Sequence, residues 1–473
     1  MAAVYNLAFD FGASSGRLIL SKLENGKIEL KEIHRFPNEP VRLGKRFCWD
    51  FLRLYEELKT GLKKAAALNL PISSIGIDTW GVDYGLLDKD GNLIGMPLNY
   101  RDDRTEGYIE KANKIVGLPY IYEKTGIQFM NFNTIFQLMS DKDIRPEIVE
   151  KADCMLFMPD LFNYYLTGVK CNEYSEASTG QMLNAKERTW DIELLEKLGI
   201  NTKLLCNLVK PGTVIGKLTE EIKAETGLGD IPVVAVGSHD TASAVAGAPL
   251  ENENSAYLCT GTWCLLGMET KEPIINEMSE KYNYTNEGGV EGTIRFLKNI
   301  NGLWIIQQLR KSWNQKHNTE LGFPEIIAET RKAIAAGKSF KVDPNDSSFM
   351  APLNMADAMV EYCQKTGQST PEGIGEIALA AYTGLVEEYK ANIEKLEIIT
   401  GKTISNINMV GGGIQDQLLC ELTAKQTGKK VLTGPIESSV LGNVLMQLKA
   451  TGNISSLQEG RKIVKASFEQ KEY

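Results

Sequence analysis

Hydrophobic and polar residues alternate in three short stretches near the start of the chain. Between residues 3 and 36, the segments VYNLAFDFGA, GRLILSKLEN and KIELKEIHRF show the period-two pattern of half-buried antiparallel strands. After Asp50, an expected N-cap, apolar side chains recur at helical spacing, which predicts a helix. The apolar segment 72–81, ISSIGIDTWG, follows as a further strand. This opening predicts the order β-β-β-α-β.

A related order of patterns returns in the second half of the chain. Residues 255–270, SAYLCTGTWCLLGMET, indicate a strand, a short Gly-Thr turn and a second strand. A long amphipathic helix is expected from about residue 374 to 399, ending near Gly401. The strand ISNINMVGGG then leads through a glycine turn into a helix from about 415 to 426. Two related halves predict a duplicated α/β domain with a cleft between the copies.

The length of the chain also favours two domains, because 473 residues exceed what one ordinary hydrophobic core supports. The polar, turn-rich segment GAPLENENS marks the expected boundary. The sequence therefore predicts an N-terminal domain of residues 1–247 and a C-terminal domain of residues 248–473.

The net charge of the chain indicates which kind of molecule it binds. A formal charge of −9 disfavours nucleic acids and anionic membranes, so a small molecule is the expected partner. No apolar run approaches the roughly 20 residues that cross a bilayer, and the N-terminus lacks the pattern of a signal peptide, so a cytoplasmic location is expected. The eight cysteines form no C-x-x-C pair, and with only three histidines they are expected to be reduced, mostly buried thiols.

The first glycine turn, Asp10-Phe11-Gly12-Ala13-Ser14-Ser15-Gly16-Arg17, joins two predicted strands. Its small residues would let backbone N–H groups and hydroxyls surround a phosphate, and Arg17 would add positive charge. Asp10 ends an apolar strand and is the expected ligand of Mg²⁺, directly or through water. The alternative is an ordinary hairpin with a solvated aspartate.

Two further glycine turns lie in the second half. Thr260-Gly261-Thr262 repeats the strand-turn-strand character of the first turn, and two such hairpins could hold the two ends of a polyphosphate. The run Gly411-Gly412-Gly413 does not match a dinucleotide-binding fingerprint, because Asp416 stands where the third glycine is required. A Walker A loop is absent from the sequence, so any nucleotide would bind by another route.

The segment VAVGSHDTASAV places Ser238, His239 and Asp240 side by side. Three consecutive side chains cannot form the relay of a hydrolase triad. The small residues that follow predict a helix, so Ser238 or Asp240 could cap it, and the helix dipole would favour the ionised carboxylate. A weak base suffices for phosphoryl transfer, whose loose transition state requires mainly positioning and charge neutralisation. These features together favour a kinase.

The sequence resembles the FGGY family of carbohydrate kinases over nearly its whole length. The segments that carry the resemblance are FDFGASSGR, EIHRF, SIGIDTWGVDYGLLD, YRDDRT, GIQF, FNTIFQL, SHDTASAV, GTW, TNEGG, LKNINGLW and VGGG. The resemblance implies two ribonuclease-H-like domains of the actin-like ATPase type, with a catalytic cleft between them that binds ATP and Mg²⁺. The implied reaction is transfer of the γ-phosphoryl group of ATP to the 1-hydroxyl of L-rhamnulose.

The resemblance also implies roles for particular residues. Asp240 would be the proton acceptor. The sugar would contact Asp240 and four further residues, namely Gly81, His239, Thr241 and Asn299. The nucleotide would contact Ala13, Ser14, Ser15, Gly16, Arg17, Thr262, Gln307 and Gly412. Alternatively, Gln307 and Asn299 are polar residues of a helix and Gly81 breaks a strand. Trp80 and Asp83 suit a sugar as well, although tryptophan is more often a core residue.

Two other functions remain open at this point. The first is a kinase for another ketose, such as fuculose or xylulose, because one methyl group or epimer changes binding by only a few kcal/mol. The second is a non-enzymatic actin-like ATPase module, which would share the glycine turns without needing DTWGVD or SHDT. The protein is expected to be a monomer or a homodimer.

Overall fold

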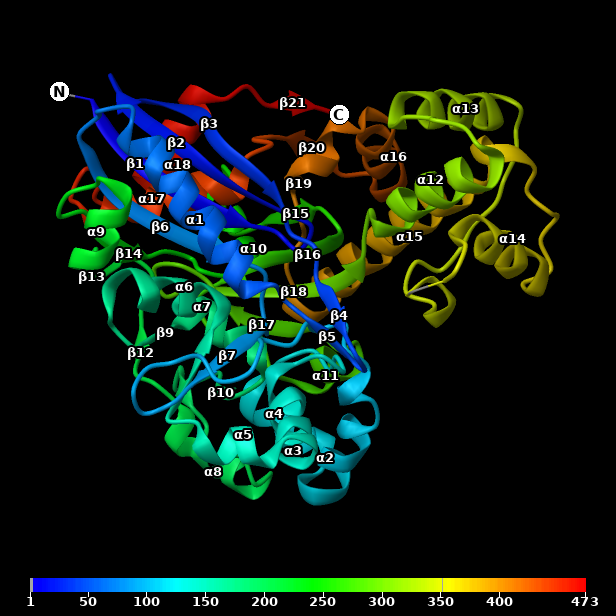
Figure 1. The fold of residues 1–473 in the computed structure, drawn as a ribbon. Helices are drawn as coiled ribbons and strands as arrows, with labels where there is room; N and C mark the ends of the chain where they lie inside the picture. Colours follow the sequence, from blue (N-terminus) through cyan, green and yellow to red (C-terminus); the bar gives the residue numbers. More distant parts are fainter. Residues whose placement is uncertain (1–2, 351) are drawn as a thin grey trace. The chain divides into compact units, whose positions relative to one another are not determined.

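The three alternating stretches at the start of the chain are strands β1 (Val4–Phe11), β2 (Ser15–Glu24) and β3 (Lys27–Pro37) of a computed structural model, which describes residues 3–350 and 352–473 (Figure 1). They belong to a six-stranded sheet of order β13-β14-β6-β1-β2-β3. Strands β1 and β6 (Ile72–Thr79) are parallel, and so are β6 and β14 (Pro232–Ala235). The predicted opening order is confirmed, with a short unpredicted hairpin of β4 (Val41–Leu43) and β5 (Arg46–Cys48) inserted before the helix.

Contacts divide the chain into two units. The first comprises Met1–Pro249, Glu269–Phe296 and Ser438–Glu469, and the second comprises Leu250–Met268, Leu297–Glu437 and Gln470–Tyr473. Two segments of the range 248–473 therefore pack with the first unit. Hydrophobic periodicity indicates where helices form but not which hydrophobic core they join. The sequence therefore held no signal that these two segments pack with the first unit.

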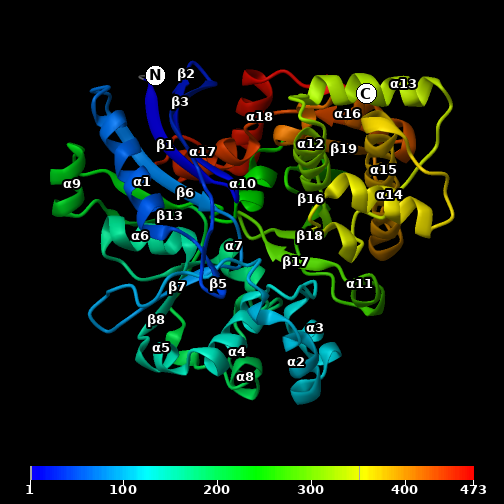
Figure 2. The ribbon, with the colours of Figure 1, turned by 45° about the vertical axis from the view of Figure 1, so that its right-hand side comes forward.

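Helices cover both faces of the sheet in the first unit. Leu7 and Phe9 contribute to a core with helix α1 (Phe51–Ala66), whereas Ala8 contributes to a core with α17 (Ser438–Ala450). Because neighbouring residues of a strand point to opposite faces, these helices lie on opposite sides of the sheet, as Figures 1 and 2 show. Asp50 caps α1 as predicted, with its Oδ1 accepting a hydrogen bond from the Arg53 backbone N–H at 3.3 Å.

The remaining elements of the first unit complete the sheet and a smaller region beside it. They are β7 (Tyr84–Leu87), α2 (Tyr108–Val116), α3 (Leu118–Thr125), α4 (Thr134–Ile144), α5 (Pro146–Lys151), β8 (Cys154–Phe157), α6 (Met158–Thr167), β9 (Asn172–Glu173), α7 (Tyr174–Ala177), β10 (Leu183–Asn184), β11 (Thr189–Trp190), α8 (Ile192–Lys197), β12 (Leu208–Val209), β13 (Thr213–Lys217), α9 (Glu220–Thr226), α10 (Asp240–Gly247), α11 (Glu277–Lys281), β17 (Thr285–Gly288) and α18 (Leu457–Ser467).

The second unit contains the other predicted strand pair and the long helix. Strands β15 (Ser255–Thr260) and β16 (Trp263–Thr270) are antiparallel, and β15 is parallel to β19 (Asn406–Val410). Helix α15 (Gly373–Thr400) ends at Gly401 in the left-handed conformation, as predicted. The other elements here are β18 (Ile294–Asn301), α12 (Trp304–His317), α13 (Phe323–Ala335), α14 (Met355–Lys365), α16 (Gln417–Thr427), β20 (Lys430–Thr433) and β21 (Lys471–Glu472).

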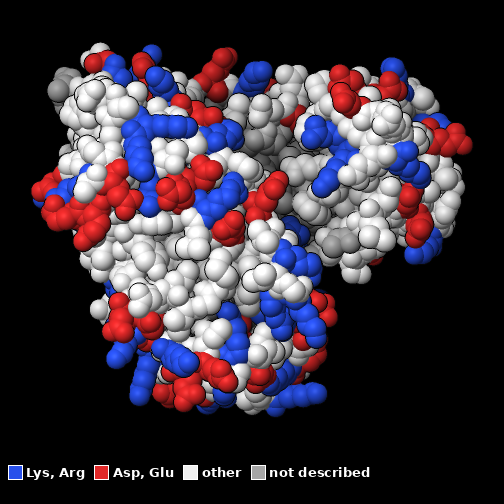
Figure 3. Space-filling model, in the orientation of Figure 1, with Lys and Arg blue, Asp and Glu red and all other residues white. Residues whose placement is uncertain are grey.

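Surface charge and helix hydropathy agree with the composition. On the face drawn in Figure 3, basic and acidic side chains are interspersed. Among the residues that the structure describes, no helix combines the length and the apolar character needed to cross a membrane.

Helices α10 and α17 pack so closely that glycine is required where they touch. A Cβ atom on Gly442 would lie 1.8 Å from the Ser243 carbonyl oxygen, and one on Gly247 would lie 2.1 Å from the Ser438 carbonyl oxygen. Both obstructing atoms are backbone atoms, so neither clash could be relieved by a side-chain movement. The contact therefore fixes α17 against the helix that begins at Asp240.

Replacement of Gly442 by alanine tests this packing. We expect Gly442→Ala to lower the free energy of unfolding by about 1–3 kcal/mol, because the added methyl group forces the helices apart. Chemical denaturation measures the change. The control is Gly229→Ala, at an exposed position where a Cβ would meet nothing within 4 Å. Equal stability of the two variants would contradict the close contact.

Candidate functional site

The carboxyl ends of the parallel strands β6 and β14 meet in the first unit. The Thr79 N–H donates to the Ser238 carbonyl oxygen at 2.9 Å, and Thr79 and His239 form an isolated parallel bridge. This bridge joins the two sequence segments that carry all the predicted sugar contacts except Asn299, namely DTWG and SHDT. In open α/β sheets ligands bind at the carboxyl ends of strands. The predicted contacts Gly81, His239 and Asp240 thus lie where such a site is expected.

Asp240 is the first residue of α10. Its side chain is 33% exposed, and its Oδ1 accepts from the Thr241 hydroxyl at 2.9 Å and lies 3.5 Å from His239 Nε2. Burial raises the pKa of Asp240, His239 opposes this increase, and Asp10 adds to it. A raised pKa makes this carboxylate a stronger base than an ordinary aspartate.

One expectation about the start of α10 was wrong. The N-cap residue is His239, and neither Ser238 nor Asp240 caps the helix; Ser238 Oγ instead donates to the Val236 carbonyl oxygen at 3.4 Å. That the helix dipole favours the ionised carboxylate of Asp240 stays a prediction. The exclusion of a hydrolase triad holds, since Ser238 Oγ is directed away from His239.

Gly81 packs directly against His239. A Cβ on Gly81 would lie 3.3 Å from His239 Nε2 and 3.1 Å from Thr179 Cγ2, so a larger residue would crowd the ring. The next residue, Val82, has a φ of 69°, a conformation that a β-branched residue adopts only when its surroundings enforce it. Two threonines hold it there: Thr179 Oγ1 accepts from the Val82 N–H at 3.0 Å, and Thr134 Oγ1 donates to the Val82 carbonyl oxygen at 2.6 Å.

Trp80 and Asp83 are the buried side chains that hold this turn in place. Trp80 is 4% exposed and its ring centroid lies 3.9 Å from that of Trp49. Asp83 is fully buried and its Oδ2 accepts from Trp49 Nε1 at 2.7 Å and Trp80 Nε1 at 3.1 Å. Burial raises the pKa of Asp83 to about 6. Both residues therefore serve the packing of the turn, as the core interpretation of Trp80 predicts.

A row of acidic residues follows the ends of the parallel strands. Asp10 on β1 pairs with Asp78 on β6 in the strand register, and the charge of Asp10 raises the pKa values of both Asp78 and Asp240. Burial, followed by the charge of Asp10, raises the pKa of Asp78 well above its usual range. Helix α17 binds both groups: Ser439 Oγ donates to Asp10 Oδ2 at 2.7 Å and Asn443 Nδ2 donates to Asp78 Oδ2 at 2.6 Å.

The first glycine turn forms a tight hairpin after Asp10. The Gly12 N–H donates to the Ser15 carbonyl oxygen at 2.9 Å, and Asn38 Nδ2 donates to the Gly12 carbonyl oxygen at 2.8 Å. Ser14 is exposed and Ala13 half-buried, so the tip is accessible. Arg17 directs its guanidinium to Asp10 Oδ2 at 2.8 Å.

The second unit brings the other two glycine turns together. Gly411 has a φ of 89°, and a Cβ there would lie 2.8 Å from the Thr260 carbonyl oxygen, so only glycine fits. Gly412 is exposed with open space around it. The Thr262 carbonyl oxygen accepts from the Gly302 N–H at 3.1 Å. The end of β15 and the glycine run after β19 are therefore neighbours, as expected for parallel strands.

Gln307 and Asn299 also belong to the second unit. Gln307 is half-buried on α12, as the helical interpretation predicts. The helical interpretation of Asn299 was wrong, because it lies on strand β18, before helix α12 begins.

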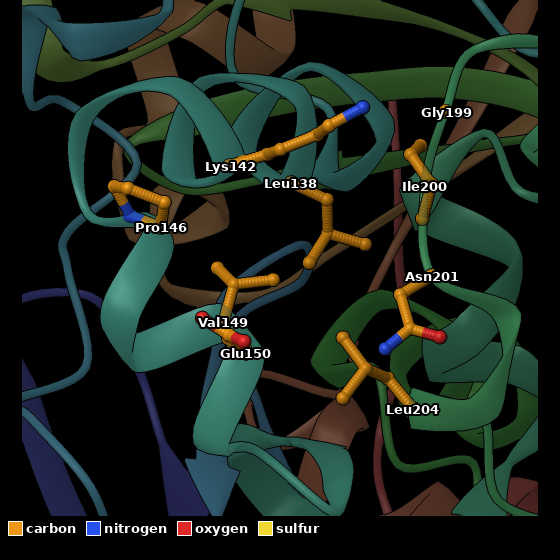
Figure 4. A pocket seen from close by; sticks show the side chains of 9 residues that line it. All are labelled: Leu138, Lys142, Pro146, Val149, Glu150, Gly199, Ile200, Asn201 and Leu204. Carbon is orange, nitrogen blue, oxygen red and sulfur yellow. The ribbon is translucent and has the colours of Figure 1, made fainter.

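No preformed metal cluster is found. In residues 3–350 and 352–473, His, Cys, Asp and Glu side chains form no group of three or more that could hold a metal ion. All eight cysteines are free thiols and all but Cys206 are buried, which confirms the expectation. A pocket of about 260 Å³ lies elsewhere in the first unit (Figure 4), lined by Leu138, Lys142, Pro146, Val149, Glu150, Gly199, Ile200, Asn201 and Leu204. None of its residues is a predicted site residue.

Several residues beside the site were not predicted from the sequence. Asp78 has the same signal as Asp10, a carboxylate at the end of an apolar strand, and could have been found. Ser439 and Asn443 could not have been predicted, because nothing in the sequence indicates that α17 packs with the first unit. Glu287 lies in the quoted segment TNEGG, and Arg295 lies between it and LKNINGLW, but neither carried a separate signal.

Comparison with known families identifies the class of protein. The family model described as "FGGY family of carbohydrate kinases, N-terminal domain" matches residues 5–247, and the C-terminal domain model matches residues 256–451. The chain belongs to this family and is a sugar kinase; sugar kinases of this family use ATP with a divalent metal.

Two of the most similar individual relatives are rhamnulokinases. The chain is 41% identical to a rhamnulokinase of Oceanobacillus iheyensis, over 98% of this chain and 97% of that protein. It is 42% identical to a rhamnulokinase of Bacteroides thetaiotaomicron, over 98% and 95%.

Solved structures agree on the fold. A xylulose kinase of Lactobacillus acidophilus, 18% identical, superposes with a TM-score of 0.82 over 97% of this chain and 92% of the other. Glycerol kinase of Plasmodium falciparum with ADP, 15% identical, gives 0.78 over 98% and 93%. The predicted α/β class with two domains of the actin-like ATPase type is confirmed.

The buried carboxyl group of Asp83 yields a pH-dependent prediction. Its pKa is about 6 in the folded protein, against an ordinary value of 3.8, so the folded state binds more protons between these values. Its contribution to stability is present at low pH and lost as the pH rises through about 6. The difference in unfolding free energy, wild type minus Asp83→Asn, should fall by about 1.4 kcal/mol between about pH 5 and pH 8.

Urea denaturation at several pH values measures this difference. The matched control is Asp103→Asn, since the Asp103 side chain is 71% exposed. A difference that stays constant or grows as the pH rises would contradict the assignment of a buried, proton-binding Asp83.

Proposed function

We propose that this protein transfers the γ-phosphoryl group of ATP to the 1-hydroxyl of L-rhamnulose, giving L-rhamnulose 1-phosphate and ADP. The observation that carries the proposal is the juxtaposition of Asp240, His239 and Gly81 at the ends of β6 and β14. The names of the relatives, at about 40% identity over the whole chain, supply the substrate.

Asp240 is the proposed proton acceptor. Its carboxylate is a third exposed, so a sugar hydroxyl can reach it, and its raised pKa strengthens it as a base. As the 1-hydroxyl oxygen attacks the γ-phosphorus, its proton passes to Asp240 and ADP leaves. His239, Thr241 and Gly81 would line the sugar beside it, and Asn299 is proposed as a further sugar contact.

The nucleotide is proposed to use both glycine hairpins. Ala13 through Arg17 would contact its phosphates, with Thr262, Gln307 and Gly412 as contacts from the second unit. On this proposal residues 1–247 carry the sugar site, and residues 248–473 carry most of the nucleotide site. The cytoplasmic location and the monomeric or homodimeric state stay predictions.

Mg²⁺ is the proposed metal. Because the described residues offer no cluster of ligands, the nucleotide phosphates would supply most of its coordination, and Asp10 would contact it through water. Both side-chain contacts of Asp10 fall on Oδ2, so Oδ1 is the oxygen that can accept a bond from metal-bound water. When bound, the ion neutralises charge that develops on the phosphates.

A kinase for fuculose or xylulose would use the same base and hairpins, but the relatives' names favour rhamnulose. A non-enzymatic ATPase module is set aside, because the chain belongs to a family of carbohydrate kinases.

Replacement of Asp240 by asparagine tests the base. Asp240→Asn keeps the shape of the side chain but cannot accept the proton, so we expect L-rhamnulose-dependent ADP release to fall about 10²- to 10⁴-fold while ATP still binds. A coupled ADP assay measures release, and calorimetry measures ATP binding.

Asp50→Asn is the matched control, because Asp50 also stands at a helix N-terminus but caps α1 outside the site. This control should retain wild-type turnover. An Asp240→Asn enzyme with turnover near that of the control would remove Asp240 as the base.

A further inference from the structure

Arg295 is a fully buried arginine that the reaction as described leaves without a role. It lies on β18, in the part of this strand that belongs to the first unit. Its Nε donates to the Gly288 carbonyl oxygen at 2.9 Å, and its terminal nitrogen NH2 lies 3.1 Å from Glu287 Oε2. The same NH2 lies at hydrogen-bond distance, 3.1 Å, from His239 Nδ1. The guanidinium is thus fixed on two sides and directed at a predicted sugar contact.

The chemistry of this hydrogen bond determines the protonation of His239. An arginine side chain is always charged and can only donate, so His239 Nδ1 must be the acceptor. The proton of the neutral ring is then on Nε2, which lies 3.5 Å from Asp240 Oδ1 and beside Gly81. In a neutral imidazole only one ring nitrogen carries a proton, so the hydrogen-bond partner of one nitrogen determines whether the other is protonated.

The other charged groups around the ring would favour a different state. Glu287 Oε2 lies 3.4 Å from Nδ1, and a carboxylate at this distance would attract a proton onto that nitrogen. Asp240 faces the opposite nitrogen, and Glu173 lies behind the turn, accepting from the Ser238 N–H at 3.1 Å. Three carboxylates therefore lie around the ring, and Arg295 places a positive charge and a hydrogen-bond donor directly at Nδ1.

We propose that Arg295 is a positioning residue that holds His239 neutral with its proton on Nε2, so that Nε2 donates a hydrogen bond to an oxygen of the ketose. Glu287 in turn neutralises the buried guanidinium. The part concerning the ketose rests on the function proposed above, whereas the state of the ring can be measured in the free enzyme.

Nitrogen-15 NMR of the histidine rings tests the tautomer directly. The chain has only three histidines, and His34→Gln and His317→Gln identify the other two signals. We expect His239 near pH 7.5 to show an unprotonated Nδ1 and a protonated Nε2. A signal from a charged ring, or from the tautomer protonated on Nδ1, would overturn the proposal whether or not the enzyme phosphorylates L-rhamnulose.

Variants of Arg295 test the consequence for the sugar. Arg295→Met alone would remove a cationic neighbour of the buried Glu287 carboxylate, so the double variant Arg295→Met with Glu287→Gln removes both charges and protects the fold. We expect its KM for the ketose to rise about 3- to 20-fold, the effect of one hydrogen bond, with the KM for ATP unchanged. Arg295→Lys keeps a hydrogen-bond donor and a positive charge, so its KM for the ketose should lie between the values of the wild type and the double variant.

Arg188→Met provides the matched control. Arg188 binds the carbonyl oxygens of Gly292 and Lys271, near the same strand, without reaching His239. If this control raised the KM for the ketose equally, or if the double variant kept the wild-type KM and the wild-type NMR signal, Arg295 would have only a structural role.

Discussion

The hydrogen bond between the Thr79 N–H and the Ser238 carbonyl oxygen is the contact on which the first unit's site depends. It continues the parallel pairing of β6 and β14 beyond the regular strands. Each strand then turns sharply, one through Gly81 and Val82 and the other into α10. This bridge brings residues about 160 positions apart in sequence to face each other, and so places Gly81 beside His239, the residue before Asp240.

The parallel strands also bring carboxylates close together at their ends, and these buried carboxylates need hydrogen-bond donors. Burial raises the pKa values of Asp78 and Asp240, and the charge of Asp10 adds to both increases. Helix α17 supplies neutral donors, Ser439 and Asn443, to two of them. These neutral donors hold the carboxylates without adding charge, beside the Arg17 guanidinium that pairs with Asp10. On the function proposed above, the remaining negative charge would suit a metal carried by a phosphate ligand.

Local structure was predictable because it follows from local pattern. The strands β1 to β3, the capped helix α1 and the glycine stop of α15 were read correctly from spacing and end signals. Tertiary features were not: the packing of Ser438–Glu469 with the first unit and the approach of Arg295 to His239 arise from contacts between distant segments. The capping error at α10 has the same origin, because Ser238 is held by the bridge to Thr79 rather than by the helix.

The central claim is that this arrangement serves phosphorylation of a particular ketose at its 1-hydroxyl. The most direct measurement is kcat/KM for ADP release with L-rhamnulose, L-fuculose and D-xylulose side by side, with NMR of the product to locate the phosphate. The account predicts the highest value for L-rhamnulose and a phosphate on its C1 oxygen. ATP turnover that no ketose stimulates, or a higher kcat/KM for one of the other two sugars, would contradict it.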